Sequence, residues 1–192
     1  MPGIIGKKIG MSQIFQEDGR MIPVTYLQCE PNTVWQVKEG KKDGADAVVL
    51  GAGKLPESSK VKKFRVLRQF SGKPEELKKG DEVSVGIFEG GEKVTVVATS
   101  KGKGFQGNVK RHNFRVIRLT HGTKYPRHGS TGCRTKPGRT KPGLKMPGRM
   151  GNDNITLRDR AVVKVDTERN LIAIKGPIPG AKNGLVLLKK QS

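Results

Sequence analysis

The feature that most constrains this chain is a long run, Lys93 to Asn152, that contains no Asp or Glu. It carries fifteen Lys and Arg residues, and acids are common on both sides of it. Glycine and proline recur every few residues, which excludes a long helix or a continuous strand. Apolar residues are too sparse to form a core that offsets the entropy of ordering. We therefore expect this run to become ordered against a partner with dense negative charge, and folded RNA fits best.

The net charge of +21 is concentrated in this run. The chain has 38 Lys and Arg against 17 Asp and Glu, and fourteen of the bases lie between Lys101 and Met150. The remaining residues are only mildly basic, as in an ordinary globular domain. Charge that served solubility alone would be spread over the chain, so its concentration predicts a segment that binds a polyanion.

Cysteine usage and hydropathy exclude several other classes of protein. Cys29 and Cys133 lie far apart and neither belongs to a C-x-x-C pair, so we expect no disulfide framework and no zinc finger. The first ten residues are too charged for a signal peptide. No apolar run approaches the roughly eighteen residues of a membrane span. The sequence predicts a soluble intracellular protein with no membrane partner.

Short alternating segments at a spacing of roughly ten residues predict a mainly β fold. Residues 3–15 and 21–29 are expected to form a hairpin around the turn Glu17 to Gly19. Further strands are expected at 34–37, 47–50, 81–88, 93–99, 161–166, 171–175 and 185–189, with hairpins joining 81–88 to 93–99 and 161–166 to 171–175. Because helix signals are few, these strands favour a small antiparallel β-barrel.

The domain organisation follows from these segments. Residues 1–98 and 153–192 are predicted to form the barrel domain, and 99–152 a long irregular basic loop extension. A loop of this length within a compact domain is expected only where it is functional. Within 54–80, where a small α/β insertion could form, residues 58–70 stay open between a basic strand and a helix, and 74–79 suggest one helical turn. We expect Trp35 in the barrel core rather than on a stacking surface.

Residues 102–107 match the G-x-G-x-x-G pattern of dinucleotide-binding proteins, but the context differs. A Rossmann unit requires an amphipathic helix next and an acidic residue about 20 positions later. This chain has no acid before Asp153. We interpret the glycines as positions where main-chain N–H groups approach RNA phosphates, beside Lys101 and Lys103. A nucleotide cofactor is not expected.

Three histidines and one cysteine of the run raise the question of a metal or catalytic site. They are His112, His121, His128 and Cys133. Their spacing is not that of a zinc site, and no carboxylate lies nearby to orient an imidazole. Histidines among arginines more often contact bases, phosphates or 2′-hydroxyls. We therefore expect no metal, no catalytic residue and no small-molecule substrate.

The repeated units 134–138 and 139–143 (R-T-K-P-G) alternate charge with turn residues. A solvated, disordered basic tail is the alternative interpretation. Against it, the segment is internal, and Phe105, Phe114 and Tyr125 are interspersed as a base-stacking surface would require. A second basic cluster lies at 60–68. Two interpretations of it stay open, a solvated strand face and a secondary RNA contact.

Several motifs together resemble one family. Residues 98–107 (ATSKGKGFQG), continuing to Lys110-Arg111-His112, are similar to the L-three family of large-subunit ribosomal proteins in its bacterial form. The opening GIIGKKIGMSQIF, the loop motifs HGTK at 121–124 and PGR at 137–139, and the return MPGRMGN at 146–152 resemble the same family. The motifs occur in the family's order and cover nearly the whole chain.

The resemblance implies a translation-protein-type β-barrel with a long extension. It implies a structural constituent of the large ribosomal subunit, in the cytoplasm, that binds directly near the 3′ end of 23S rRNA and nucleates 50S assembly. The extension would reach toward the peptidyl-transferase centre, and the ribosomal proteins L-fourteen and L-nineteen would be neighbours. The alternatives are a general nucleic-acid-binding protein and an NADP-dependent enzyme.

The predicted rRNA-binding residues all lie in the basic loop extension. They are Lys101, Gly102, Lys103, Gly104, Phe105, Gly107, Lys110, Arg111, His112, Arg115, Arg118, His121, Lys124, Tyr125, Arg127, His128, Arg134, Lys136, Arg139, Lys141, Lys145 and Arg149. Arg149 stands where some bacterial relatives of the family carry a methylated glutamine. We expect its guanidinium to contact phosphate instead.

Overall fold

The computed structural model describes residues 3–39, 46–56, 63–72, 77–116, 120, 122, 129–132 and 135–190. The chain divides into two compact units, Met1–Ser100 with Asn154–Ser192 and Lys101–Asp153. We refer to the first unit as the body and to the second as the extension, and describe each by itself.

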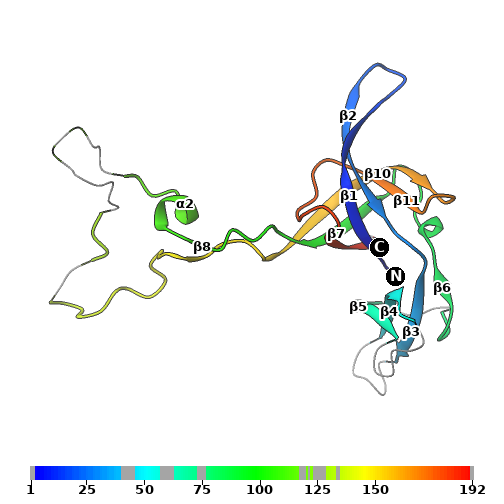
Figure 1. The fold of residues 1–192 in the computed structure, drawn as a ribbon, viewed down its shortest axis with the longest axis horizontal. Coiled ribbons are helices and arrows are strands. Elements are labelled where there is room, and N and C mark those ends of the chain that lie inside the picture. Colours follow the sequence, from blue (N-terminus) through cyan, green and yellow to red (C-terminus); the bar gives the residue numbers. More distant parts are fainter. Residues whose placement is uncertain are drawn as a thin grey trace. The chain divides into compact units, whose positions relative to one another are not determined.

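Six strands of the body close into an antiparallel barrel (Figure 1). In the order of hydrogen-bonded neighbours they are β1 (Gly3–Phe15), β12 (Leu185–Lys190), β7 (Lys93–Thr99), β10 (Asn154–Asp166), β11 (Leu171–Lys175) and β2 (Met21–Gln28). The ring is complete because β2 pairs with both β1 and β11. The predicted mainly β, antiparallel fold class is confirmed.

The barrel closes around an apolar interior because its strands alternate with a period of two. In β7, Val94, Val96 and Ala98 are buried, and the residues between them are partly exposed. Val186 and Leu188 repeat this pattern in β12, each with 0% exposure. Each apolar side chain withdrawn from water in this way contributes about 1.5–3 kcal/mol. The barrel core therefore follows from the alternation of side chains.

Both of the hairpins that join barrel strands lie where the sequence predicts them. β1 and β2 pair antiparallel around residues 16–20, with a register shift between Lys8 and Gly10. At the turn, the N–H of Gly19 donates to the carbonyl of Gln16 at 2.9 Å. Gly19 adopts φ +73°, a conformation that glycine tolerates without strain. β10 and β11 form the second hairpin, around residues 167–170.

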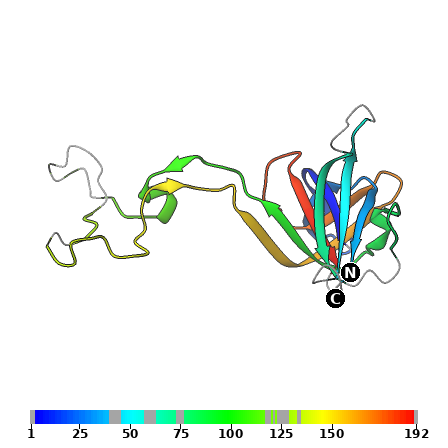
Figure 2. The ribbon, with the colours of Figure 1, turned by 90° about the horizontal axis from the view of Figure 1, so that it is seen from below.

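A second, four-stranded sheet of the body has the order β5-β4-β3-β6 (Figure 2). Its strands are β3 (Asn32–Lys38), β4 (Ala47–Lys54), β5 (Phe64–Ser71) and β6 (Glu82–Val83). A separate apolar cluster around Val34, Leu50 and Phe70 lies against this sheet. Ile5 of β1 belongs to this cluster, whereas its neighbour Ile4 belongs to the barrel core. Successive side chains of one strand thus face two cores.

The hairpin predicted to join 81–88 to 93–99 is wrong. Within 81–88 only β6 is a strand, and it pairs with β3 instead of β7. Val85–Ile87 form a 3₁₀ turn, η1. Val85 and Phe88 are both buried in the barrel core. Their spacing of three residues suits a turn with i and i+3 on one side, whereas a strand would place them on opposite faces.

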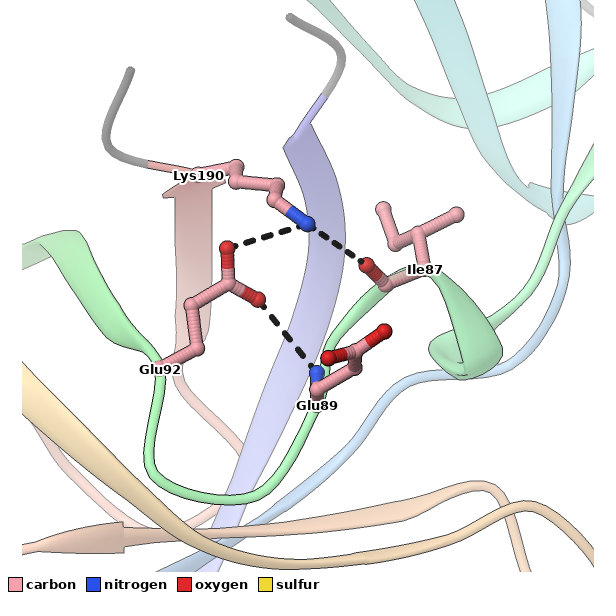
Figure 3. Close-up of polar contacts among 4 residues, drawn as sticks. All are labelled: Ile87, Glu89, Glu92 and Lys190. Carbon is pink, nitrogen blue, oxygen red and sulfur yellow. Dashed lines mark hydrogen bonds and ion pairs between the residues drawn. The ribbon is translucent and has the colours of Figure 1, made fainter.

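The turn after η1 is fixed to the barrel by polar contacts (Figure 3). The ammonium of Lys190, in β12, lies 3.0 Å from Oε1 of Glu92 and 3.4 Å from the carbonyl oxygen of Ile87. The other carboxylate oxygen of Glu92 accepts the backbone N–H of Glu89 at 3.3 Å. One carboxylate thus connects both sides of the turn to the last strand of the barrel.

The structure also decides the alternatives left for 54–80. Phe64–Ser71 is a strand, which is one of the two predicted alternatives. The predicted helical turn at 74–79 falls partly outside the described residues, and Leu77 to Lys79 are not helical. The expectation that Trp35 lies in the barrel core is wrong. It lies half-buried on β3, at a register shift between Val34 and Gln36 that takes it out of the regular alternation.

The extension contains three short elements. These are β8 (Phe105–Gln106), α2 (Asn108–His112) and β9 (Gly148–Arg149). The rest of its described residues form turns and irregular backbone, as its glycine and proline content predicts. No helix in the described part of the chain is long and apolar enough to span a membrane.

Candidate nucleic-acid interface

The two ends of the extension run antiparallel to each other. β8 and β9 form a two-stranded ladder in which Phe105 pairs with Arg149 (Figure 2, green and yellow arrows). Beyond the ladder, the N–H of Lys103 donates to the carbonyl of Met150 at 2.8 Å, and the N–H of Met150 donates to that of Gly104 at 3.0 Å. We call residues 101–116 and 146–153 the root of the extension.

Two glycines allow the strands of the root to pack closely. Gly151 has φ +75°, and a Cβ there would lie 2.1 Å from the carbonyl oxygen of Lys101. A Cβ at Gly148 would lie 2.4 Å from a guanidinium nitrogen of Arg111. Both distances are shorter than any van der Waals contact. These glycines therefore serve packing within the protein, whereas Gly104 and Gly107 have open space around them.

Helix α2 is hydrogen-bonded to the returning chain. Nη1 of Arg111 donates to the carbonyl of Met146 at 2.8 Å. Nε2 of His112 lies 3.1 Å from the same oxygen and donates to it in the tautomer protonated there. The helix ends at Asn113, in the left-handed conformation with φ 57°. Arg111 and His112 thus position the root, and both are only partly exposed.

Most of the described Lys and Arg residues of the extension are exposed. Those with exposed side chains are Lys101, Lys103, Lys110, Arg115, Lys136, Arg139, Lys141, Lys145 and Arg149. The two ion pairs formed between described residues, Lys7–Glu30 and Lys190–Glu92, both lie in the body. Lys136, Arg139 and Lys141 border an open hollow of about 490 Å³. The extension therefore presents positive charge to a partner.

An aromatic side chain lies among these basic residues. Phe105 is 74% exposed and faces Arg149 across the ladder. An exposed phenyl ring beside a guanidinium can stack on a base while the charge contacts a phosphate. The rings of His112 and Phe114 lie 6.2 Å apart and tilted by 45°. Both rings belong to the root rather than to the hollow.

The remaining predicted site residues fall outside the described residues. They are Arg118, His121, Lys124, Tyr125, Arg127, His128 and Arg134. Their role in binding RNA stays a prediction. Of the four residues weighed as a metal or catalytic site, only His112 is described, and its contact is the Met146 carbonyl.

The local fold argues against a dinucleotide site at 102–107. The strand within this motif, β8, has two residues, and the helix that follows has five. A Rossmann unit places a longer helix against a parallel sheet and binds pyrophosphate at the start of that helix. The described residues contain no group of three His, Cys, Asp or Glu side chains that could hold a metal ion.

Neither the β8–β9 ladder nor the contact of Arg111 with Met146 could be predicted from the sequence. The paired residues are more than forty positions apart, and each strand is only two residues long. No periodicity can emerge from two residues. The one signal was the presence of glycines at 148 and 151, which the composition of the loop conceals because glycine is common throughout it.

Comparison with known proteins gives consistent matches. The family model described as "Ribosomal protein L3" matches residues 65–170. The "Large ribosomal subunit protein uL3" of Heliobacterium modesticaldum is 45% identical over 97% of this chain and 95% of its own length. Proteins of the same name from Treponema denticola and Dehalococcoides mccartyi are 43% and 46% identical, each over 98% of this chain and 97% of their own.

Proposed function

The chain belongs to the ribosomal protein L3 family, and from that premise we propose that it binds ribosomal RNA directly through its extension. Its relatives are named as proteins of the large ribosomal subunit. This chain is a structural constituent of that subunit, in the cytoplasmic ribosome. Family membership supports a structural rather than an enzymatic role.

The observation that carries the proposal is the set of exposed Lys and Arg side chains on a folded root whose single acid, Asp153, lies at its end. Lys101, Lys103 and Lys110 are exposed within a few residues of one another. Hydrogen bonds between Lys103 and Met150 and between Arg111 and Met146 hold the backbone beneath them. Basic side chains on a preformed backbone lose less conformational entropy on binding than basic side chains on a free chain.

The Lys and Arg side chains of the extension would act mainly on RNA phosphates. Each Lys or Arg that neutralises a phosphate releases condensed counterions, and this release supplies affinity that depends on salt but not on sequence. Phe105, next to Arg149, would add stacking on an unpaired base. Recognition of this kind reads the shape and charge of folded RNA.

The finer placement rests on the family resemblance of the motifs. We propose that the protein binds near the 3′ end of 23S rRNA as a primary binder and nucleates 50S assembly. We further propose that the extension reaches toward the peptidyl-transferase centre and that L-fourteen and L-nineteen are neighbours of the body. The rRNA-binding residues would be those predicted above.

The test is binding to 23S rRNA between roughly 50 and 200 mM salt, with duplex DNA as competitor. A protein that neutralises six to ten phosphates loses about 10³ to 10⁵ in affinity over this range. Replacing Lys101, Lys103 and Lys110 with Ala is expected to weaken binding. The negative slope of log K against log salt should become less steep, by roughly two to three. Replacing the exposed Lys164, Lys175 and Lys182 of the body is the matched control.

The outcomes separate the proposal from a general nucleic-acid-binding protein. A tight rRNA-selective component that survives at 200 mM salt supports the proposal. Equal competition by duplex DNA, or an unchanged salt slope in the triple variant of the extension, contradicts it.

A further inference from the structure

The chain's single tryptophan lies in an aromatic pair on the second sheet of the body. Trp35 of β3 and Phe64 of β5 contact each other edge to face, with ring centroids 5.7 Å apart and planes at 73°. Neither residue belongs to the apolar clusters of the two cores. Both are partly exposed. The pair therefore remains accessible from solvent.

A glycine of the intervening strand makes room for this pair. A Cβ at Gly51 of β4 would lie 2.6 Å from Cγ of Phe64. The Phe64 ring thus rests directly on the backbone of β4. Gly51 pairs with Thr33 on one side and with Leu67 on the other. The rings are supported by the sheet, and a preorganised surface of this kind loses little entropy when a ligand binds.

Two lysines lie against Trp35. The ammonium of Lys63 is 5.7 Å and that of Lys79 is 5.6 Å from the ring centroid, both within the range of a cation–π interaction. Both lysines are exposed. The ion pairs formed between described residues involve neither of them. Their charge is thus available to an incoming anion.

The aromatic pair and the lysines line one open recess of about 500 Å³. Leu55 and Pro56 extend its apolar wall, and Lys54 adds a third ammonium. Among the residues that the structure describes, no Asp or Glu lines it. A recess with flat apolar surfaces and cations at its rim matches a planar apolar group that carries negative charge.

We propose that this recess binds an unpaired nucleotide of ribosomal RNA, with the base against Trp35 and Phe64 and the adjacent phosphates contacted by Lys54, Lys63 and Lys79. Binding would move the lysine ammonium groups from the indole ring to the phosphates. The inference rests on the proposed function for the identity of the partner. It adds a contact on the body that is separate from the residues of the extension.

An unpaired nucleotide explains the recess better than duplex RNA or an acidic peptide. Stacking on Trp35 requires a free base face, which neighbouring base pairs cover inside a duplex, and single-stranded nucleic acid is bound by aromatic side chains within a cationic groove. An acidic peptide would satisfy the lysines but would leave the indole and phenyl rings without a planar partner. Binding of a polyanion without bases is accordingly one outcome of the test.

Because Trp35 is the chain's only tryptophan, its fluorescence reports on this recess alone. The full chain is titrated with a ten-nucleotide oligoadenylate, with an RNA hairpin of equal charge and a short loop, and with inorganic polyphosphate. RNA binding is followed separately by the anisotropy of a label on the RNA. Stacking predicts saturable quenching of Trp35 by the oligoadenylate, weaker quenching by the hairpin and none by polyphosphate.

Variants assign the effect to the recess. Removing one aromatic stacking partner typically lowers affinity roughly 5- to 150-fold. Phe64→Ala, and Trp35→Ala followed by anisotropy, are expected to show such a loss, whereas Trp35→Phe retains most of the affinity. These measurements use a background with Lys101, Lys103 and Lys110 replaced by Ala, so that the extension does not mask the recess. Lys63→Gln and Lys79→Gln keep the rings and test the cations, with Lys182→Gln as control.

The outcomes distinguish this inference from the proposed function. Quenching by the oligoadenylate, reduced in Lys63→Gln and Lys79→Gln but not in Lys182→Gln, supports the recess. If anisotropy reports bound RNA while Trp35 emission stays constant, the recess is rejected and the extension remains the RNA-binding element. Equal quenching by polyphosphate also rejects it, because a polyanion without bases would then suffice. If no RNA binds at all, the proposed function itself fails.

Discussion

At the scale of single residues, the glycines of the extension divide into two kinds. The sequence predicts that those of 102–107 allow close approach to phosphates, and Gly104 and Gly107 do have open space around them. Gly148 and Gly151 instead allow one part of the root to pack against another. The sequence could not separate the two kinds, because the difference lies in which backbone passes beside each glycine.

Gly151→Ala is predicted to open the root. A left-handed conformation costs a non-glycine residue about 1–3 kcal/mol, and the added Cβ would also overlap the Lys101 carbonyl. Hydrogen exchange at the amides of Lys103 and Met150 measures the effect. Gly104→Ala is the matched control, since its φ is +68° but nothing lies within 4 Å. We expect protection to fall at least tenfold further in Gly151→Ala, and equal losses would refute the packing role.

Cys29 gives a prediction about pH. Burial raises the pKa of its thiol from an ordinary 9.0 to about 12. The unfolded thiol ionises above pH 9 while the folded one stays neutral. The resulting stability is present below pH 9 and is lost as pH rises toward 12. At pH 10.5 the wild type should have lost about 2 kcal/mol relative to Cys29→Ala. Urea unfolding of both at pH 8 and 10.5 measures it, and parallel losses would contradict it.

At the scale of elements, the sequence predicts strands better than it predicts their partners. β1, β2, β10 and β11 have alternating residues and a local turn, so their hairpins could be derived from neighbouring residues. β6 could not be placed, because its partner β3 lies about fifty residues earlier. The apolar spacing also changes from two to three at Val85 and Phe88, which ends the strand and starts η1.

Lys190→Met is predicted to loosen η1 and its turn. The change removes both the contact with Glu92 at 3.0 Å and that with the Ile87 carbonyl. Because Lys190 is about a third exposed, we discount the pair for screening and expect a loss of roughly 1 kcal/mol in the free energy of unfolding. Denaturant unfolding measures this loss.

Lys7→Met is the control for that variant. Lys7 lies 3.8 Å from Glu30, and both side chains are about half exposed. A longer and more exposed ion pair contributes little in water. We expect the unfolding midpoint of Lys7→Met to stay within error of the wild type. A loss as large as that of Lys190→Met would mean that the polar contacts of Lys190 stabilise the fold no more than an exposed ion pair does.

At the scale of the whole molecule, charge and core lie in different units. The residues of both apolar clusters come from the body. The acid-free run coincides almost completely with the extension. Composition was therefore sufficient to predict where charge gathers, because charge density is a sum over residues. It could not predict the ladder, the helix α2 or the Trp35 recess, since each depends on contacts between distant residues.

A deletion within the extension tests this separation. Replacing residues 127–145 with a short Gly-Ser linker keeps the root, including the bond from Arg111 to Met146. Since none of the deleted residues that the structure describes belongs to either core, the denaturant midpoint of the body should not change. Complete large subunits should nevertheless form in lower yield, because the Lys and Arg side chains of the deleted segment would no longer neutralise rRNA phosphates.

A second variant separates charge from length in this experiment. Replacing Lys136, Arg139, Lys141 and Lys145 with Gln keeps every backbone atom but removes four positive charges. If phosphate neutralisation is the function of this segment, the variant should assemble almost as poorly as the deletion, and added magnesium should partly restore assembly by screening the phosphates. Normal assembly of the Gln variant beside a defective deletion would assign the role to the chain's shape. Normal assembly of both would remove the segment from assembly altogether.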